Sequence, residues 1–480
     1  MTPVGQDAER DGVTARDGQK ERIEPKIGRN LLKTRMATNP YLLLIVTLGL
    51  IARFGWFFLR PGTATAEAAR EAVSFAQGVG LSNAYFDGQG PTAHLLPIPP
   101  MIAGSVYYML GIHSPMSEFV LACWSIGLSA GSALMFYSAF AQLGMPRRSL
   151  LIGLGCLVLL PTYINLEVVD FRIWDGGLAV FIMSILFNRI IHYDSLGNGT
   201  VMQSLTLAIT AAFLFFVNPI VGVSGYTCCF IYLLRTLNLR KAAIAVFLSG
   251  LTLALLIMPW ILRNELVLGT AIPLRSNGGI ELAISMYPGA ELQHNDTDLR
   301  FARRMAQVHP YDNPANISRL RDAGGEVAYS QSLLHVTTVW MVENPFKVFQ
   351  ISVSHLQQIY FPSPAIFRIF AKGGGAQFRS YLARSVGFLG LIGLIIGTIT
   401  GDRRWIYPAV MIVMPGLLMM MFQPVPRYTY LIYGLLCFSG GQVAALGSGI
   451  IARAGRWRRA RRQTGRRSGT GRVIAHGVGF

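Results

Sequence analysis

The sequence predicts an all-α polytopic membrane protein, a bundle of about ten transmembrane helices with two large external loops. The first reason is composition. Of the 480 residues, 52% are hydrophobic and only 14% are charged, whereas about 25% of the residues of a soluble protein are charged. The mean hydropathy is +0.43. The second reason is distribution, because charges are missing from stretches of about 20 residues and gather between them, as a bilayer requires.

Eleven apolar runs are candidate spans, at residues 41–59, 97–112, 116–142, 150–165, 174–190, 203–218, 220–235, 242–262, 383–400, 405–422 and 428–448. Cytoplasmic segments retain Lys and Arg, and this rule selects among the runs. If 97–112 crossed the membrane, Arg147 and Arg148 would lie outside and every later basic cluster would be inverted. The run is also short and begins with prolines at Pro97, Pro99 and Pro100. We therefore expect it to lie in the outer interface or to be re-entrant, which leaves ten spans and two cytoplasmic termini.

This topology divides the chain into five parts. They are a disordered cytoplasmic arm (1–38), a membrane core (39–262) that includes the first external loop (60–115), a second external loop with short helices (263–382), the C-terminal transmembrane helices (383–448) and a basic cytoplasmic tail (449–480). Because the start of the chain is polar and the first apolar run is too long for a signal peptide, we do not expect a cleavable signal peptide here. Much of the net charge of +18 lies in the tail at Arg453–Arg472, and a second basic cluster runs from Arg16 to Arg35. Such flanks typically contact anionic lipid headgroups, so membrane lipids are the expected partners and nucleic acid is not.

Metal and disulfide chemistry has no signature in the sequence. The five cysteines all lie within apolar runs, so neither a disulfide framework nor a metal-ligand spacing is present. No HExxH, GxSxG or paired-cysteine pattern occurs. We expect no metal site.

Glu67 is the first candidate for chemistry. It lies in an Ala-rich segment of the first external loop that is expected to form a helix ending at Gly78. A carboxylate near the bilayer surface, under a partly desolvated lid, can have a raised pKa and act as a general base. The alternative is an ordinary exposed helix residue that pairs locally with Arg70. Spacing alone favours this alternative. His94 follows in the same loop.

A second group of ionisable residues surrounds an expected helix start, namely Glu167, Asp170, Arg172 and Asp175. Ionisable residues at membrane depth are candidates for function. Asp175 could equally be a helix cap that is favoured by the helix dipole, and this argument leaves the two interpretations balanced. The neighbouring Trp174 could be an aromatic residue of the membrane interface.

Three arginines in external positions run against the cytoplasmic bias of basic residues, namely Arg263, Arg275 and Arg427. Guanidinium groups bind phosphate in a two-pronged geometry, so these residues are candidates for phosphate binding. The alternative is that they pair with loop carboxylates or extend to lipid headgroups.

Several short motifs follow one another within residues 41–448. They are Glu67, Gly78–Ser82, Gly90–His94, Pro97–Pro100, Ile173–Asp175, Asn218–Pro219, Pro259–Asn264, Pro273–Asn277, Gly279–Leu282, Gly325–Glu326 with Tyr329, Asn344–Pro345 and Pro426–Tyr428. In this order the chain resembles the polyprenyl-phosphate-dependent glycosyltransferases of the GT-C fold, a group that includes protein mannosyltransferases and lipid A aminoarabinose transferases. It looks most similar to bacterial members with unassigned substrates.

The resemblance implies a GT-C-like bundle with two juxtamembrane helices in the first periplasmic loop and a large periplasmic loop after the seventh helix. It further implies a bacterial inner-membrane enzyme that transfers a hexosyl or pentosyl group, with inversion, from a polyprenyl-phosphate donor to a glycan or lipid acceptor. The lipid-phosphate sugar is then a co-substrate, and no other cofactor is expected. Many relatives carry an Asp three residues before the loop glutamate. Here that position is Ala64, and only Glu67 remains.

Roles for the candidate residues follow from the same resemblance. Glu67 or Asp175 would deprotonate or orient the acceptor hydroxyl, and the other carboxylate would stabilise the developing oxocarbenium charge, with Asp170 as a third catalytic candidate. The expected substrate-binding residues are His94, Trp174, Arg263, Arg275, Glu281, Arg427 and Tyr428. Two alternatives remain open, namely a lipid or sugar transporter or flippase that uses the same cavity, and a catalytically inactive relative. Transporters tend to place polar groups near the bilayer midplane, whereas the charges here gather at the outer rim.

Overall fold

In the computed structural model, the described residues are 39–60, 62–291, 297–311, 313–370 and 374–443. The arm predicted for residues 1–38 and the tail predicted for 449–480 lie outside them. By its contacts the chain forms two units, Met1–Leu44 and Ile45–Phe480, and the second unit is the one that contains the features below. Among the described residues every regular element is a helix, and β structure is limited to one isolated bridge between Ser82 and Pro91.

The helices follow one another in this order: α2 (Pro40–Leu59), α3 (Glu67–Ala76), α4 (Ile98–Leu110), α5 (Pro115–Gln142), α6 (Arg147–Leu159), α7 (Ile164–Val168), η1 (Asp170–Arg172), α8 (Gly176–Ser195), α9 (Val201–Val217), α10 (Pro219–Thr236), α11 (Leu239–Leu268), α12 (Gly278–Ser285), α13 (Thr297–Val308), α14 (Pro314–Asp322), α15 (Glu326–Glu343), α16 (Pro345–Tyr360), α17 (Pro364–Phe370), α18 (Ala376–Thr400), η2 (Arg403–Trp405), α19 (Ile406–Leu418) and η3 (Met419–Met421). A further helix begins at residue 426 and is described to residue 443.

The structure is that of a helical protein with several membrane spans. Six helical segments of the described residues are long and apolar enough to cross a membrane, namely α2, α5, α8, α11, α18 and Arg403–Met421. A seventh span would join Arg147–Leu159 to Ile164–Arg172, a pair bent by 69°. Pro161 lies in the break between these two segments, and proline cannot continue a helix. The expected ten spans stay a prediction, because α9 is a shorter apolar helix and the last helix runs into undescribed residues.

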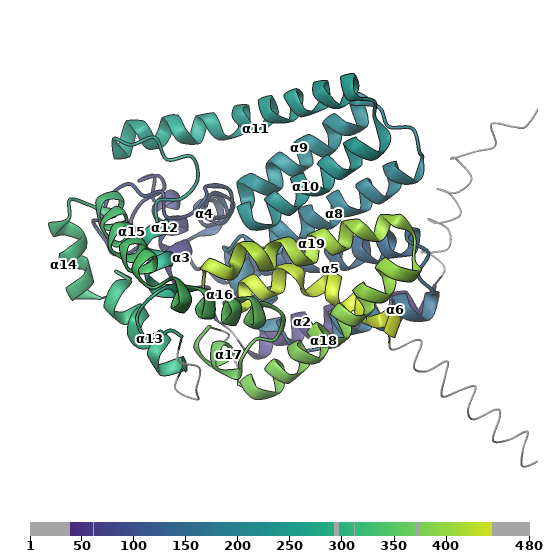
Figure 1. Ribbon diagram of the computed structural model, residues 1–480. Coiled ribbons are helices and arrows are strands. Elements are labelled where there is room, and N and C mark those ends of the chain that lie inside the picture. Colours follow the sequence, from purple (N-terminus) through teal and green to yellow (C-terminus); the bar gives the residue numbers. More distant parts are fainter. Residues whose placement is uncertain (1–38, 61, 292–296, 312, 371–373, 444–480) are drawn as a thin grey trace, which may run out of the picture. The chain divides into compact units, whose positions relative to one another are not determined.

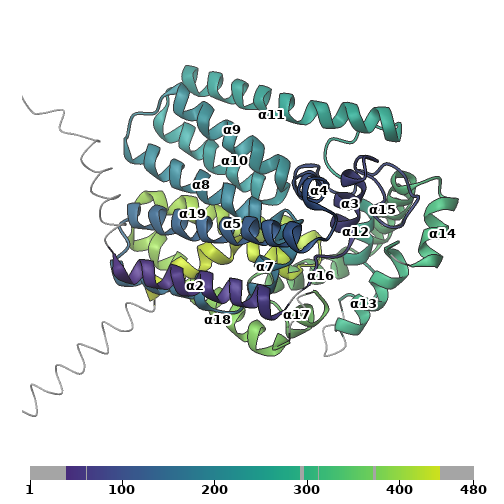
Figure 2. The ribbon, with the colours of Figure 1, turned by 180° about the vertical axis from the view of Figure 1, so that it is seen from behind.

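The segment that we expected not to cross the membrane forms α4. Its 13 residues rise only about 20 Å, less than the hydrocarbon thickness of about 30 Å. Figures 1 and 2 show α4 almost end-on, whereas α8, α9 and α10 run across both views. The helix therefore crosses the direction of the long helices, as a segment in the interface would.

The two segments predicted to be external loops pack together at one end of the long helices. Figure 1 shows α3 and α12 to α16 gathered there. One apolar core joins Tyr85 and Phe86 of the first loop to Ile280, Ile284 and Phe301 of the second. The side chains of this core exclude water from between the loops, so the loops form one cap.

Glu326 connects the same two loops through hydrogen bonds. Its carboxylate accepts from Thr92 Oγ1 at 2.6 Å, from the backbone N–H of Ala93 at 2.8 Å and from Gln89 Nε2 at 2.7 Å, all of the first loop. Ser276 Oγ of the second loop donates at 2.8 Å. A buried carboxylate with this many donors is stabilised in place, so the relative position of the loops is well defined.

Two basic clusters that are far apart in the sequence lie together. Arg235, at the end of α10, and Arg404, in η2, line one cavity of about 840 Å³ with Asp194. Arg235 pairs with Asp194 at 3.1 Å, and Arg404 pairs with Asp402 at 2.8 Å. The end of α10 and the start of Arg403–Met421 therefore lie close together, and their cytoplasmic position stays a prediction.

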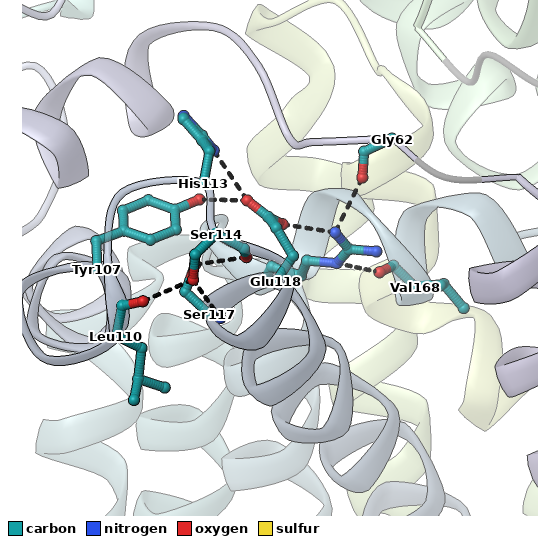
Figure 3. A network of polar contacts seen from close by, with 9 residues as sticks. Gly62, Tyr107, Leu110, His113, Ser114, Ser117, Glu118 and Val168 are labelled. Atoms are coloured by element: carbon teal, nitrogen blue, oxygen red, sulfur yellow. Dashed lines mark hydrogen bonds and ion pairs between the residues drawn. The ribbon is translucent and has the colours of Figure 1, made fainter.

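A buried network fixes the start of α5 against the segment that precedes α8 (Figure 3). Arg172 donates to Glu118 at 2.7 Å, to the carbonyl of Gly62 at 2.9 Å and to the carbonyl of Val168 at 2.6 Å. Tyr107 and His113 contact the other oxygen of Glu118 at 3.1 and 2.8 Å. The Arg172 side chain is 1% exposed, so this charge depends on Glu118 for compensation.

We predict that Glu118→Gln destabilises the protein by about 3 kcal/mol, because it leaves the Arg172 charge buried without a counterion. Thermal unfolding of the purified protein in detergent measures the loss. Asp87→Asn is the matched control, since the Asp87 side chain is 95% exposed in its pair with Arg70 and surface pairs contribute at most about 1 kcal/mol. Equal stability of the two variants would contradict a structural role for the network.

Candidate active site

A cavity of about 420 Å³ lies where the two loops meet the start of α8 and the start of the last helix. Six of the predicted site residues line it, namely Glu67, His94, Trp174, Glu281, Arg427 and Tyr428. Apolar side chains of α12 and α13 also line it, with Ile284, Phe301, Ala302, Met305 and Ala306. The rest of the lining includes His309, Tyr311, Asn313 and Gln423. The lining thus combines charged, aromatic and apolar side chains.

Glu67 is the first residue of α3, and its predicted helix does end before Gly78, which has a φ of +81°. Its Oε1 lies 3.1 Å from Nε2 of His309, which follows α13 directly. The two side chains are 11% and 14% exposed. The alternative in which Glu67 pairs with Arg70 is not supported, because Arg70 pairs with Asp87 at 2.8 Å. Glu67 and His309 form an acid–base pair at the cavity wall.

His94 lies beside this pair in a cluster of rings. Its Nδ1 shares a hydrogen bond of 2.8 Å with the hydroxyl of Tyr85. The Tyr85 ring packs edge-on against both imidazoles, at 4.9 Å from His94 and 5.6 Å from His309. Burial, and then the neighbouring charge of His309, hold the pKa of His94 well below its usual value. His94 is therefore a neutral polar group in the site.

Glu71, one helical turn after Glu67, lies beneath the cavity wall and is 0% exposed. Burial, followed by the negative charge of Glu326, raises the pKa of Glu71 well above its usual value. The protonated form of Glu71 is neutral, so it adds no negative charge next to Glu67.

Arg427 lies in the first turn of the last helix, with its guanidinium 4.0 Å from the centre of the Trp174 ring and 5.3 Å from that of Tyr428. Within the described part of the chain it has neither a hydrogen bond nor an ion pair. Stacking on Trp174 holds the guanidinium plane, and the N–H groups at its edge remain available in the cavity. The start of a helix also favours an anion.

Asp175 and Arg275 are brought together, but neither lines the cavity. Asp175 precedes α8 in the cap position, yet its side chain makes no cap hydrogen bond. Its Oδ2 accepts instead from Arg275 Nη2 and Asn218 Nδ2, each at 2.9 Å. The two predicted site residues therefore neutralise each other next to Trp174.

Arg263 and Asp170 contact backbone groups instead of lining the cavity. Arg263 donates to the carbonyls of Thr92 and Leu81 at 2.6 and 2.7 Å, and so ties α11 to the first loop. Asp170 starts η1, and its carbonyl accepts from the N–H of Trp174 at 3.0 Å. Neither residue lines the cavity. Both hold elements in place around it.

His309, Tyr85 and Tyr311 are site residues that the sequence analysis did not identify. No spacing rule links His309 to Glu67, because the pair forms only when the second loop folds over the first. The available sequence signal for these residues was the segment His309-Pro310-Tyr311, which directly follows an amphipathic helix. Among the described residues, no group of three His, Cys, Asp or Glu side chains has the geometry to hold a metal ion.

We predict that His94→Gln flattens the loss of stability in acid. The lowered pKa of folded His94 means that the unfolded chain binds a proton below pH 6.5 that the folded chain does not bind. This contribution to stability is present above that pH and is lost as the pH falls. Thermal unfolding between about pH 7.5 and about pH 5 measures the slope. Parallel curves for the variant and the parent would contradict the buried neutral imidazole.

No protein-family model and no curated protein matches this sequence. Among solved structures, the chain is similar to the oligosaccharyltransferase AglB of the archaeon Archaeoglobus fulgidus in complex with an inhibitory peptide and a dolichol-phosphate, with 9% identity, a TM-score of 0.47, and coverage of 87% of this chain and 52% of AglB. The same organism's enzyme tethered to an acceptor peptide has 10% identity, a TM-score of 0.48, and coverage of 86% and 50%. This chain spans about half the length of these proteins. A likeness at this level does not extend to substrates or site residues.

Proposed function

We propose that this protein is a membrane glycosyltransferase that moves one sugar from a polyprenyl-phosphate donor to a glycan or lipid acceptor. The observation that carries the proposal is the shared cavity of Glu67, His309 and Arg427. An acid–base pair and a stacked, unpaired guanidinium are the two elements that an acceptor hydroxyl and a donor phosphate require. We assign the cavity to the periplasmic face of a bacterial inner membrane, with both termini in the cytoplasm.

The donor phosphate binds Arg427 in this proposal. Trp174 holds the guanidinium plane at 4.0 Å, so two parallel N–H···O bonds to one phosphate form with little loss of side-chain freedom. Arg275 does not compete for this role, because its Nη2 is bound to Asp175. The volume of about 420 Å³ lies within the range of small-molecule sites and suits a single hexosyl or pentosyl unit.

Glu67 removes the proton of the acceptor hydroxyl as the new bond forms between that oxygen and the anomeric carbon. The bond between the anomeric carbon and the phosphate oxygen breaks, and polyprenyl phosphate leaves with its electron pair. Attack from the side opposite the phosphate inverts the anomeric carbon. His309, 3.1 Å from Glu67, orients the carboxylate. Glu281 lines the same cavity and supplies the second negative charge near the oxocarbenium-like carbon, and we propose it for this role in place of Asp175, which does not line the cavity.

We predict that Glu67→Gln lowers the transfer rate about 100-fold or more, because a general base contributes about 10² to 10⁴. His309→Gln should have a similar effect, and the double variant should lose little more, since paired residues act as a unit. The assay measures transfer of radiolabelled sugar from a polyprenyl-phosphate donor in proteoliposomes. Glu265→Gln is the control, because Glu265 is exposed on α11.

Full transfer by Glu67→Gln would remove this mechanism. Lipid movement across the proteoliposome membrane without any bond cleavage, in the parent chain, would instead establish the transporter or flippase alternative. A parent chain that binds the donor but shows neither sugar transfer nor lipid movement would be a catalytically inactive relative.

We predict that Arg427→Met raises the KM for the lipid-phosphate donor about 10-fold to 100-fold, since hydrogen bonds to a charged group contribute about 1.5–3 kcal/mol. Arg427→Lys should recover only part of the loss, because an ammonium group keeps the charge but cannot stack on Trp174 or bind in two-pronged fashion. Steady-state kinetics with varied donor measures both. Arg303→Gln, exposed on α13 outside the cavity, is the control. An unchanged donor KM in Arg427→Met would place the phosphate elsewhere.

A further inference from the structure

The second loop carries an exposed apolar corner where α15 meets α16. We name residues 334–353 the elbow. Its exposed large apolar side chains are Leu334, Val336, Val339, Val342, Phe346, Phe349 and Val353. Three of them are among the more exposed apolar side chains of the described residues, with Val342 at 81%, Phe346 at 71% and Phe349 at 61%. A contiguous apolar surface of this kind marks a site of contact with a membrane or another protein.

The two helices of the elbow expose apolar residues in different ways. On α15 the exposed positions 334, 336, 339 and 342 fall on several sides of the helix rather than on one stripe, which is typical of a helix end surrounded by an apolar medium. On α16 the exposed Phe346, Phe349 and Val353 share one face at i, i+3 and i+7. Ile351 and Ile359 are buried on another face. Helix α16 therefore has two apolar faces, one that is buried against the protein and one that is exposed.

The packed face of α16 sets the position of the elbow relative to a candidate span. Tyr360 Oη donates to the carbonyl of Ile412 at 3.1 Å, and His355 Nδ1 lies 3.1 Å from the carbonyl of Met420, so the part of α16 that follows the elbow runs beside residues 412–420. Within the elbow, Ser352 Oγ lies 3.9 Å from Met421 Sδ, at the end of the span Arg403–Met421. The elbow therefore lies at the end of this span, where hydrocarbon gives way to the interface. Figure 1 shows α16 beside this end of α19.

The same helix also contacts a candidate span. Tyr360, at the end of α16, packs against Gly387 of α18, whose Phe378, Tyr381 and Phe388 are exposed. Only Glu343 and Lys347 are formally charged within the elbow, and Lys347 lies 3.8 Å from Glu291. A long side chain of this kind keeps its charge in the interface while its stem contacts apolar groups. Helix α14, in the same loop, exposes Ser318, Arg319 and Arg321 instead.

We infer that the elbow enters the lipid leaflet at its interface on the cavity side of the membrane, so that lipid chains cover Val342, Phe346 and Phe349. A later turn of the same helix reaches the cavity, because Gln358 accepts from Gln423 Nε2 at 2.9 Å and Gln423 lines the cavity. Gln358 follows Val353, the last exposed residue of the elbow, by a rise of about 8 Å along the helix. The inference rests on the membrane spans and not on sugar transfer.

The first test uses the unmodified chain in vesicles of phosphatidylethanolamine and phosphatidylglycerol, with a carbene-generating probe on the acyl chains. Illumination followed by peptide mass spectrometry should label peptides of residues 334–353 as well as those of α18. Peptides of α14 should remain unlabelled. Labelling of α18 without labelling of the elbow would overturn the inference.

The second test places a nitroxide at Phe349→Cys or Val342→Cys after alanine replaces the five cysteines, and measures collisions with oxygen and with a water-soluble nickel complex in the same vesicles. Both labels should show frequent oxygen collisions and a loss of nickel collisions, as at Phe388→Cys on α18. Ser318→Cys on α14 is the aqueous reference. Nickel collisions equal to that reference would overturn the inference. Exclusion of both reagents, with dipolar broadening between labels, would assign the elbow to a second copy of the chain and also overturn it.

Discussion

Glu326 accepts hydrogen bonds from Thr92 and Ala93 of the first loop and from Ser276 of the second, and the rest of the site depends on this bond set. A carboxylate removed from water needs several donors to offset its desolvation, and here the donors come from segments far apart in sequence. The backbone N–H of Ser276 also donates to the carbonyl of Ala93 at 2.9 Å. These bonds bring α13 and His309 over α3, which is the arrangement that creates a cavity beside Glu67.

The distribution of paired charges separates structural from candidate functional residues. Arg53 pairs with Glu167 at 2.6 Å, Arg172 with Glu118 at 2.7 Å and Arg275 with Asp175 at 2.9 Å. Each pair holds two elements together in surroundings that exclude water, where an uncompensated charge would be costly. Among the described residues Arg427 differs, because it contacts two aromatic rings and no carboxylate. Its guanidinium N–H groups, which bind no carboxylate directly, are the physical basis on which we propose an anionic substrate at this position.

The elbow and the cavity place two properties of a lipid-phosphate substrate on the two sides of one helix. Apolar residues of α16 face outward, whereas Gln358 contacts the cavity residue Gln423. A substrate with a long hydrocarbon chain and a charged, sugar-bearing head needs both environments within a short distance. Water-soluble sugars need only the second. In our proposal, this arrangement serves a substrate that is itself a membrane lipid.

The sequence by itself determined the helical membrane architecture, the ends of many elements and the residue types near the site. The length of an apolar run and the position of a basic cluster are properties of the local sequence, so they can be identified without knowledge of packing. Likewise Gly78 and the prolines at residues 97–100 indicated the end of α3 and the start of α4.

Only the tertiary structure decided which charged groups meet. Glu167, Asp170, Arg172 and Asp175 are neighbours in sequence, yet Glu167 pairs with Arg53, Arg172 with Glu118, and Asp175 with Arg275. The partner of Glu67, His309, comes from a distant loop. A side chain's partner is set by where distant helices cross and by which charges must be compensated out of water, and neither is a property of local sequence.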